Sequence, residues 1–201
     1  MGRELEIKLA VDGEEALEKI LADGTIAALV DGPWQERLMK TTYYDSPDRR
    51  FSSHFWTLRH RMEGKNSVVC VKVPTEDPRV RGEWQISAAE INEESIEALL
   101  KSGAPMELLY LYGAGDIQPV CGAEFIRKSV MLRFSDSSRA ELAGDHGILH
   151  GKNQQLPFAE LEIELYEGAP TEMEALAAML QTRYGLKHQN KSKFARARAL
   201  I

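Results

Sequence analysis

The sequence predicts an α+β fold in a single domain over residues 1–201. Two observations predict it: segments that alternate polar and apolar residues are scattered along the chain, and amphipathic stretches with helical spacing lie between and after them. Because alternate side chains of a strand share a face, the predicted sheet has one polar and one apolar face. A hydrophobic content of 43% in 201 residues is enough to bury a core.

The first predicted strand, Glu4–Val11, carries two carboxylates and an ammonium on one face. These side chains are Glu4, Glu6 and Lys8, and the residues between them are apolar. A helix over Glu14–Leu21 follows, because its apolar residues recur at helical spacing. The N-terminal segment therefore predicts a strand, with an unusually acidic polar face, followed by a helix.

The next elements are bounded by turn signals. A strand over Leu38–Tyr44 ends at Asp45-Ser46-Pro47-Asp48, which is typical of a turn. Strands over 55–62 and 67–73 surround a glycine-containing segment and predict a hairpin. A short strand over 83–87 precedes a helix over 92–101, which has Asn92 as N-cap and Gly103 as stop signal.

The C-terminal half repeats the acidic strand pattern. Strands are predicted over 125–134 and 138–143, and Gly144–Gly147 is predicted to be a turn. The strand Phe158–Tyr166 then alternates carboxylates with apolar residues through Glu160, Glu162 and Glu164. After a break at 168–170, a helix extends from Thr171 to near Gly185, and the tail 191–200 forms a last short helix.

Composition excludes several classes of protein. A net charge of −6 argues against a nucleic-acid partner, which usually requires a basic surface. Two cysteines, Cys70 and Cys121, are too few for a disulfide framework, and no paired Cys or His spacing indicates zinc. No signal peptide and no apolar run of about 18–20 residues is present, so we expect a cytoplasmic protein without a membrane partner. The oligomeric state is not fixed by the sequence, and a homodimer stays open.

The polar strand faces combine acids with bases, and two interpretations compete. Taken strand by strand, they resemble solvated faces with cross-strand ion pairs, each stabilising by only ~0–1 kcal/mol. Taken together, they fit the lumen of a closed barrel, where acids and bases would be desolvated together. In a lumen, Mg²⁺ or Mn²⁺ would neutralise the carboxylates, and a polyphosphate would neutralise the arginines and lysines.

An ordered set of motifs resembles the CYTH superfamily, the triphosphate tunnel metalloenzymes. The resemblance spans essentially the whole chain, and the set is specific although each motif is weak alone. The motifs are Glu4-x-Glu6-x-Lys8, Tyr43-Tyr44-Asp45-Ser46-Pro47-Asp48, Leu58-Arg59-His60-Arg61, Lys72, Arg81-Gly82-Glu83-Trp84, Phe125-Ile126-Arg127, Asp145-x-Gly147, Glu160-Leu161-Glu162-Ile163-Glu164 and Ser192-Lys193.

The resemblance implies a closed, eight-stranded antiparallel β-barrel that forms a tunnel, with helices packed outside. It also implies a metal-dependent triphosphatase that acts on a small-molecule triphosphate, and the bacterial inorganic triphosphatase branch favours tripolyphosphate as substrate. The implied metal ligands, for Mg²⁺ or Mn²⁺, are Glu4, Glu6, Asp145, Glu160 and Glu162. The implied phosphate-binding residues are Lys8, Arg59, Arg61, Lys72, Arg81, Arg127 and Lys193.

Some roles stay open at this point. Lys8 and Tyr43 are predicted to be catalytic, polarising the attacking water, with Tyr44 as the alternative to Tyr43. Glu83 and Glu164 have no assigned role. The alternative functions are a class IV-type adenylate cyclase, a thiamine or nucleoside triphosphatase, and a non-catalytic polyphosphate-binding module. The products from tripolyphosphate and from ATP would distinguish them.

Overall fold

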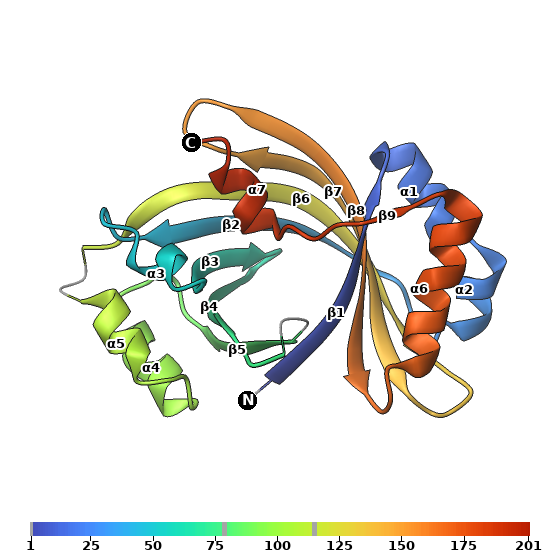
Figure 1. The fold of residues 1–201 in the computed structure, drawn as a ribbon, viewed down its shortest axis with the longest axis horizontal. Helices are drawn as coiled ribbons and strands as arrows, with labels where there is room; N and C mark the ends of the chain where they lie inside the picture. Colours follow the sequence, from blue (N-terminus) through green and yellow to red (C-terminus); the bar gives the residue numbers. More distant parts are fainter. Residues whose placement is uncertain (1, 78–79, 114–115) are drawn as a thin grey trace.

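The computed structural model describes residues 2–77, 80–113 and 116–201, and within them eight antiparallel strands close into a barrel (Figure 1). The strands are β1 Gly2–Val11, β2 Gln35–Asp45, β3 Thr57–Glu63, β4 Asn66–Pro74, β5 Val80–Ser87, β6 Gln118–Arg133, β7 Arg139–His150 and β8 Gln155–Glu167. Their order is β5-β4-β3-β2-β6-β7-β8-β1, and pairing of β1 with β5 closes the ring. A two-residue strand, β9 (Lys187–His188), also pairs with β1.

Strand β1 joins the two halves of the barrel. Its first residues pair with β5, where Glu4 lies opposite Arg81. Its later residues pair with β8, where Lys8 lies opposite Glu162. Because cross-strand partners share a face, this register brings the acidic strands side by side with their carboxylates pointing the same way. The closed, eight-stranded antiparallel barrel is thereby confirmed, with helices packed outside it apart from the last one.

The helices cover separate parts of the barrel wall. Their bounds are α1 Gly13–Leu21, α2 Gly24–Leu29, α3 Arg50–Ser53, α4 Glu93–Lys101, α5 Glu107–Tyr112, α6 Thr171–Tyr184 and α7 Lys193–Arg198. Figure 1 shows α1, α2 and α6 together on one side of the barrel and α4 and α5 together on the opposite side. Among the described residues, no helix combines the length and the apolar composition needed to cross a membrane.

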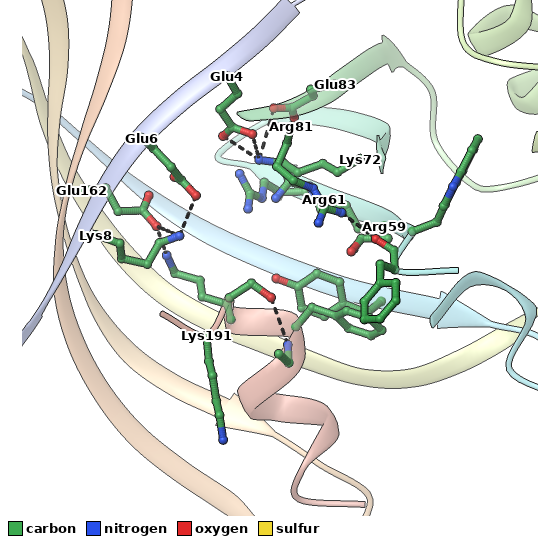
Figure 2. Close-up of a pocket in the computed structure, with 18 of the residues that line it drawn as sticks. Glu4, Glu6, Lys8, Arg59, Arg61, Lys72, Arg81, Glu83, Glu162 and Lys191 are labelled. Carbon is green, nitrogen blue, oxygen red and sulfur yellow. Dashed lines mark hydrogen bonds and ion pairs between the residues drawn. The ribbon is translucent and has the colours of Figure 1, made fainter. Parts of the chain in front are cut away.

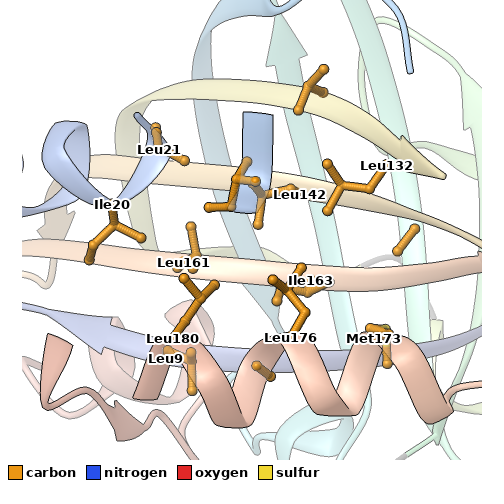
Figure 3. Packing of buried hydrophobic residues seen from close by; sticks show 14 of the residues in the cluster. Leu9, Ile20, Leu21, Leu132, Leu142, Leu161, Ile163, Met173, Leu176 and Leu180 are labelled. Atoms are coloured by element: carbon orange, nitrogen blue, oxygen red, sulfur yellow. The ribbon is translucent and has the colours of Figure 1, made fainter. Parts of the chain in front are cut away.

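Two hydrophobic cores lie between these helices and the outer barrel face. In the first, Leu176 and Leu180 of α6 and Ile20 of α1 pack on strand residues such as Leu161 and Leu142 (Figure 3). Each fully buried side chain of this size stabilises the fold by roughly 1.5–3 kcal/mol. In the second, α4 and α5 pack on β3, β4 and β5; its strand residues are Leu58, Val69, Val71, Val73 and Trp84. The apolar strand faces are thus covered by helices, which leaves the polar faces for the interior.

The last helix, α7, packs on the inward-facing side of β6 and β7. Phe194 and Ala197 are buried against Tyr43 and Phe125, and the rings of Phe194 and Tyr43 are 5.1 Å apart. Ser192 begins the helix, because its side chain accepts a hydrogen bond from the Ala195 amide. The short tail helix was predicted, and the structure places its first turn beside the buried carboxylates.

The predicted turn at Gly144–Gly147 is wrong. These residues lie in the middle of β7 and pair with both β6 and β8. Gly147 is required there for a different reason: a Cβ atom would lie 2.2 Å from the Glu124 carbonyl oxygen. A glycine that permits close backbone approach inside a strand resembles a turn signal in the sequence.

Candidate active site

The barrel surrounds a partly open cavity of about 1800 Å³, lined by side chains from distant parts of the chain. Figure 2 shows residues of β1, β3, β4, β5 and β8 converging on it, with Lys191 from the segment before α7. The predicted residues that line it are Glu4, Glu6, Lys8, Tyr43, Arg59, Arg61, Lys72, Arg81, Arg127, Glu162 and Lys193. Asp145 and Glu160 are fully buried behind the lining.

One group of charges lies where β1 meets β4 and β5. Lys72 Nζ lies 2.5 Å from Glu4 and 3.2 Å from Glu83, and Arg59 lies 3.1 Å from Glu83. Although burial raises the pKa of Glu83, the charges of Lys72 and Arg59 outweigh it and hold this pKa well below its usual value. Glu83 is therefore ionised and fixes two of the predicted phosphate-binding cations in place.

Lys8 connects this group to the acidic strand β8. Its Nζ lies 2.7 Å from Glu6 and 3.3 Å from Glu162 (Figure 2). Burial lowers the pKa of Lys8, but the carboxylates of Glu162 and Glu6 raise it more, so the net shift is upward. Lys8 is therefore protonated, and it can donate hydrogen bonds and stabilise negative charge rather than accept a proton.

A second acidic group lies deeper, on β7 and β8. Asp145, Glu160 and Glu162 bring one oxygen each to within 4.8 Å of one another, a spacing that could hold a metal ion. Lys193 of α7 contacts all three, with its Nζ 2.6 Å from Asp145 and 2.9 Å from Glu162. These acids are therefore already paired with a cation of the chain.

Arginines complete the pairing of this deeper group. Arg127 of β6 lies opposite Asp145 of the neighbouring strand β7, 2.7 Å away, and also contacts Glu162. Arg196, a basic residue of the tail to which the sequence assigns no role, contacts Glu160. Its signal was weak because it belongs to a run of alternating Ala and Arg in the tail. The five predicted metal ligands thus divide into Glu4, Glu6 and Glu162 at the cavity, and Asp145 and Glu160 beneath it.

Arg61 is a buried cation with few acidic neighbours. Its Nε donates to Thr41 Oγ1 at 2.9 Å, and its nearest carboxylate among the described residues, Glu63, is 3.7 Å away. Burial lowers the pKa of Arg61, and the charges of Arg59 and Arg127 lower it further. Within the described residues, Arg59 Nε is a buried donor with no partner. This part of the cavity is therefore short of negative charge, which fits an anionic ligand.

Glu164, whose role was left open, faces the cavity beside other acids. It lies opposite Glu6 in the β1–β8 register. Burial, followed by the charge of Glu4, raises its pKa to about 8. Carboxylates that crowd in this way are stabilised by a shared cation. Its signal in the sequence was the continued alternation after Glu160 and Glu162.

The remaining predicted residues lie at the cavity wall. Tyr43 is buried and lines the cavity, whereas Tyr44 packs on the outer core beneath α4 and α5. Of the two tyrosines, Tyr43 therefore faces the site. Arg81 lines the cavity, and its Nη2 donates to the carbonyl oxygen of Phe55 at 2.6 Å.

Comparison with known proteins agrees with this architecture. Residues 2–197 match the CYTH domain family. The chain belongs to the CYTH family. A curated CYTH relative, the inorganic triphosphatase of Haemophilus influenzae, is 29% identical over 173 residues, which cover 84% of this chain and 46% of that protein. The chain thus spans about half the length of this relative.

Solved structures share the CYTH barrel at lower identity. An adenylyl cyclase candidate from Hippeastrum, described as having a dominant triphosphatase activity, has a TM-score of 0.62 at 19% identity, covering 98% of this chain and 96% of that one. A candidate adenylate cyclase from Bacillus halodurans has a TM-score of 0.58 at 14% identity, covering 96% of both chains. At these identities, the similarity establishes the fold.

CYTH triphosphate tunnel metalloenzymes use divalent metals, and the donor set of this chain fits such an ion. The cavity offers hard carboxylate oxygens from Glu4, Glu6, Glu162 and Glu164, which Mg²⁺ and Mn²⁺ prefer. Burial is the main cause of the raised pKa of Glu164, and the charges of Glu4 and Glu6 add to it. A divalent cation would relieve that repulsion, so an acidic site suited to such a cation is present.

Proposed function

We propose that residues 1–201 form one CYTH domain that hydrolyses the terminal phosphoanhydride of a linear triphosphate in a divalent-metal-dependent reaction. Inorganic tripolyphosphate is the favoured substrate. One observation carries the proposal: desolvated cations and carboxylates from distant strands face one cavity, and among the described residues the buried Arg61 has no carboxylate closer than 3.7 Å. The curated relative named an inorganic triphosphatase adds support.

The cationic wall is proposed to hold the phosphates. Arg59 and Arg61 lie two residues apart on β3, so their guanidinium groups reach the same cavity. Each offers a planar set of donors suited to phosphate oxygens, and Lys72 adds a compact charge from β4. Arg81, Arg127 and Lys193 extend the positive wall on either side. Shielding of the phosphate oxygens lets a water molecule approach the phosphorus.

Mg²⁺ or Mn²⁺ would be held by Glu4, Glu6 and Glu162 at the cavity surface. When bound, such an ion neutralises phosphate charge and lowers the pKa of bound water. Asp145 and Glu160 belong to the same proposed ligand set, but Lys193 and the two arginines occupy their oxygens. We therefore expect these two acids to act mainly by holding Glu162 and Lys193 in position.

Lys8 and Tyr43 are proposed to assist the reaction itself. The protonated Lys8, held by Glu6 and Glu162, can stabilise charge that develops on phosphate oxygens. Tyr43 lies opposite Arg59 in the β2–β3 register and can orient water through its hydroxyl. Water attacks the terminal phosphorus, the bridging P–O bond breaks, and orthophosphate and pyrophosphate leave.

Release of orthophosphate from tripolyphosphate tests the proposal. We expect release with Mg²⁺ or Mn²⁺ and none with excess EDTA. Glu6→Gln should lose most turnover and keep its melting temperature, because the substitution preserves shape while removing a metal-binding charge. Lys40→Ala, which alters an exposed lysine outside the cavity, is the matched control. Wild-type turnover in Glu6→Gln at limiting metal would contradict the metal assignment, and cyclic AMP from ATP would indicate a cyclase.

A further inference from the structure

Helix α5 is apolar on both of its faces. In α5 and the preceding Met106, Glu107 is the only charged residue. Leu108, Leu111 and Tyr112 form the inner face and are buried in the second hydrophobic core. A helix with apolar residues all round is normally covered on all sides, so the outer face of α5 is short of a packing partner.

Three large side chains occupy that outer face and are named here the α5 patch. Met106 is 67% exposed, Leu109 is 44% exposed and Tyr110 is 73% exposed. They adjoin one another, because residues three and four positions apart lie side by side on a helix. Figure 1 shows α5 beside α4 at the edge of the molecule, outside the barrel. Single exposed apolar residues are ordinary on a protein surface, whereas a contiguous group of them indicates an interaction site.

Acidic residues accompany the α5 patch in the segment 89–113, which contains α4 and α5. The segment has five glutamates and one lysine, so it contributes a net charge of −4 to the −6 of the whole chain. The glutamates, all of them exposed, are Glu90, Glu93, Glu94, Glu97 and Glu107. Lys101 lies 3.5 Å from Glu97, whereas Glu93, Glu94 and Glu107 have no ion pair among the described residues. The segment therefore presents apolar surface and unneutralised negative charge together.

These charges indicate which kind of partner fits the α5 patch. A second copy of this chain, packed through the same face, would bring like-charged glutamates together, and an anionic membrane surface would be repelled in the same way. A protein helix that has apolar side chains on one face and lysines or arginines at its flanks would bury the patch and pair with the glutamates. Tyrosine and methionine are enriched at the centres of such interfaces, because both offer a large contact area.

We propose that the α5 patch is a docking site for a basic, amphipathic helix of a partner protein. The apolar face of that helix packs on Met106, Leu109 and Tyr110, and its cations lie beside the glutamates. Neither the patch nor the five glutamates line the barrel cavity, so docking leaves the proposed reaction site accessible. One helix laid on another buries a small area, and we therefore expect a transient complex with a Kd on the order of 10 μM.

A synthetic peptide tests the apolar contact. The probe has about 18 residues and places leucine on one helical face and lysine on the other. Fluorescence anisotropy of the labelled peptide gives the Kd for wild type and for Tyr110→Ser, in which we expect a rise of about tenfold. Leu38→Ser, which removes a 55% exposed leucine from β2, is the matched control and should keep the Kd within about twofold.

The acidic contribution is tested separately. Glu94→Gln combined with Glu107→Gln should raise the Kd about threefold at low salt and make it less dependent on salt concentration, because two charges facing the peptide are lost. The same peptide with glutamate at every lysine position should not bind. All the substituted side chains are exposed, so the melting temperatures should stay within about 2 °C of wild type, and weaker binding then cannot be attributed to unfolding.

Three results would overturn the proposal. They are an absence of binding to wild type, an equal Kd for wild type and Tyr110→Ser, and equal binding of the lysine and glutamate peptides. A fourth comes from sedimentation: a wild-type dimer that dissociates in Tyr110→Ser would show that a second copy of the chain covers the α5 patch instead.

Discussion

Arg61 shows most clearly, among single residues, how charge imbalance in the barrel favours an anion. A buried guanidinium normally has a close carboxylate, but its nearest one in the described chain is 3.7 Å away. Arg59 and Arg127 add positive charge around it. Its hydrogen bond to Thr41 holds the side chain inward. Arg61 is thus oriented for a ligand rather than for a structural partner.

Arg61→Met should weaken tripolyphosphate binding without destabilising the fold. The substitution removes a buried charge and strands no closely paired carboxylate, so the melting temperature should hold or rise. A hydrogen bond to a charged phosphate contributes roughly 1.5–3 kcal/mol, so we expect Kd to rise about 10- to 150-fold. Calorimetric titration checks the affinity, with Lys40→Met as control. An unchanged Kd would show that the phosphates bind elsewhere.

The Glu164 carboxyl predicts how stability depends on pH when no metal is added. Its folded-state pKa is raised to about 8 from the usual 4.5, so the folded protein binds this proton more tightly than the unfolded chain does. The resulting stability is fully present below pH 4.5 and is lost as pH rises through about 8. In Glu164→Gln, the free energy of unfolding should fall less over this range. Urea titrations at several pH values measure this free energy. An identical dependence of the free energy of unfolding on pH in both proteins would contradict the prediction.

Helix α7 is held in place by ion pairs as well as by packing. Lys193, in its first turn, contacts three buried carboxylates from β7 and β8. The lysine supplies a positive charge that keeps the acids compatible with burial. The attachment of this helix is therefore coupled to the charge state of Asp145, Glu160 and Glu162.

Lys193→Met should destabilise the protein strongly. The change leaves Asp145 and Glu160 with fewer cations in a buried setting, and breaking such a network typically costs ~3–5 kcal/mol. Lys191→Met is the matched control, because Lys191 is exposed and its side chain has no ion pair among the described residues. Denaturant unfolding compares the two variants. Equal stability of both would mean that the Lys193 contacts contribute little.

Gly147 permits β6 and β7 to approach closely. An added Cβ atom would lie 2.2 Å from the Glu124 carbonyl oxygen and 2.5 Å from Phe125 Cα, and both are backbone atoms that cannot move easily. Gly147→Ala should therefore lower the melting temperature by several degrees. In Gly24→Ala, the new Cβ atom would have open space at the start of α2, so that variant should be neutral or slightly more stable. Equal melting temperatures would contradict the packing argument.

At the level of elements, residue patterns predicted the long strands and helices and the short tail helix α7, but missed three other short helices. The alternation in β1 and β8 is regular over many residues, so both strands could be recognised. Helices α2, α3 and α5 have six residues or fewer, too few for a helical period to stand out. The segment Gly144–Gly147 was predicted wrongly because glycine has the same sequence signal in a turn and in a tightly packed strand.

For the molecule as a whole, closure of the barrel determines the site, and it depends on long-range register. Alternation alone could not distinguish a solvated sheet face from a lumen; the resemblance to the CYTH family supplied that distinction. The pairing of β1 with β5 brings Glu4 beside Arg81, about 77 positions apart in the chain. The burial of Asp145 and Glu160 beneath the cavity could not be predicted from the sequence either, because it depends on where the Lys193 side chain lies.

The most direct test of the triphosphate tunnel is a crystal structure of the protein with tripolyphosphate and Mn²⁺, using anomalous scattering to locate the metal. We predict the phosphate chain inside the barrel, in contact with Arg59, Arg61 and Lys72, and a manganese peak beside Glu4 and Glu6. A triphosphate bound on the outer surface, with an interior free of metal and phosphate, would contradict the tunnel as the site of reaction.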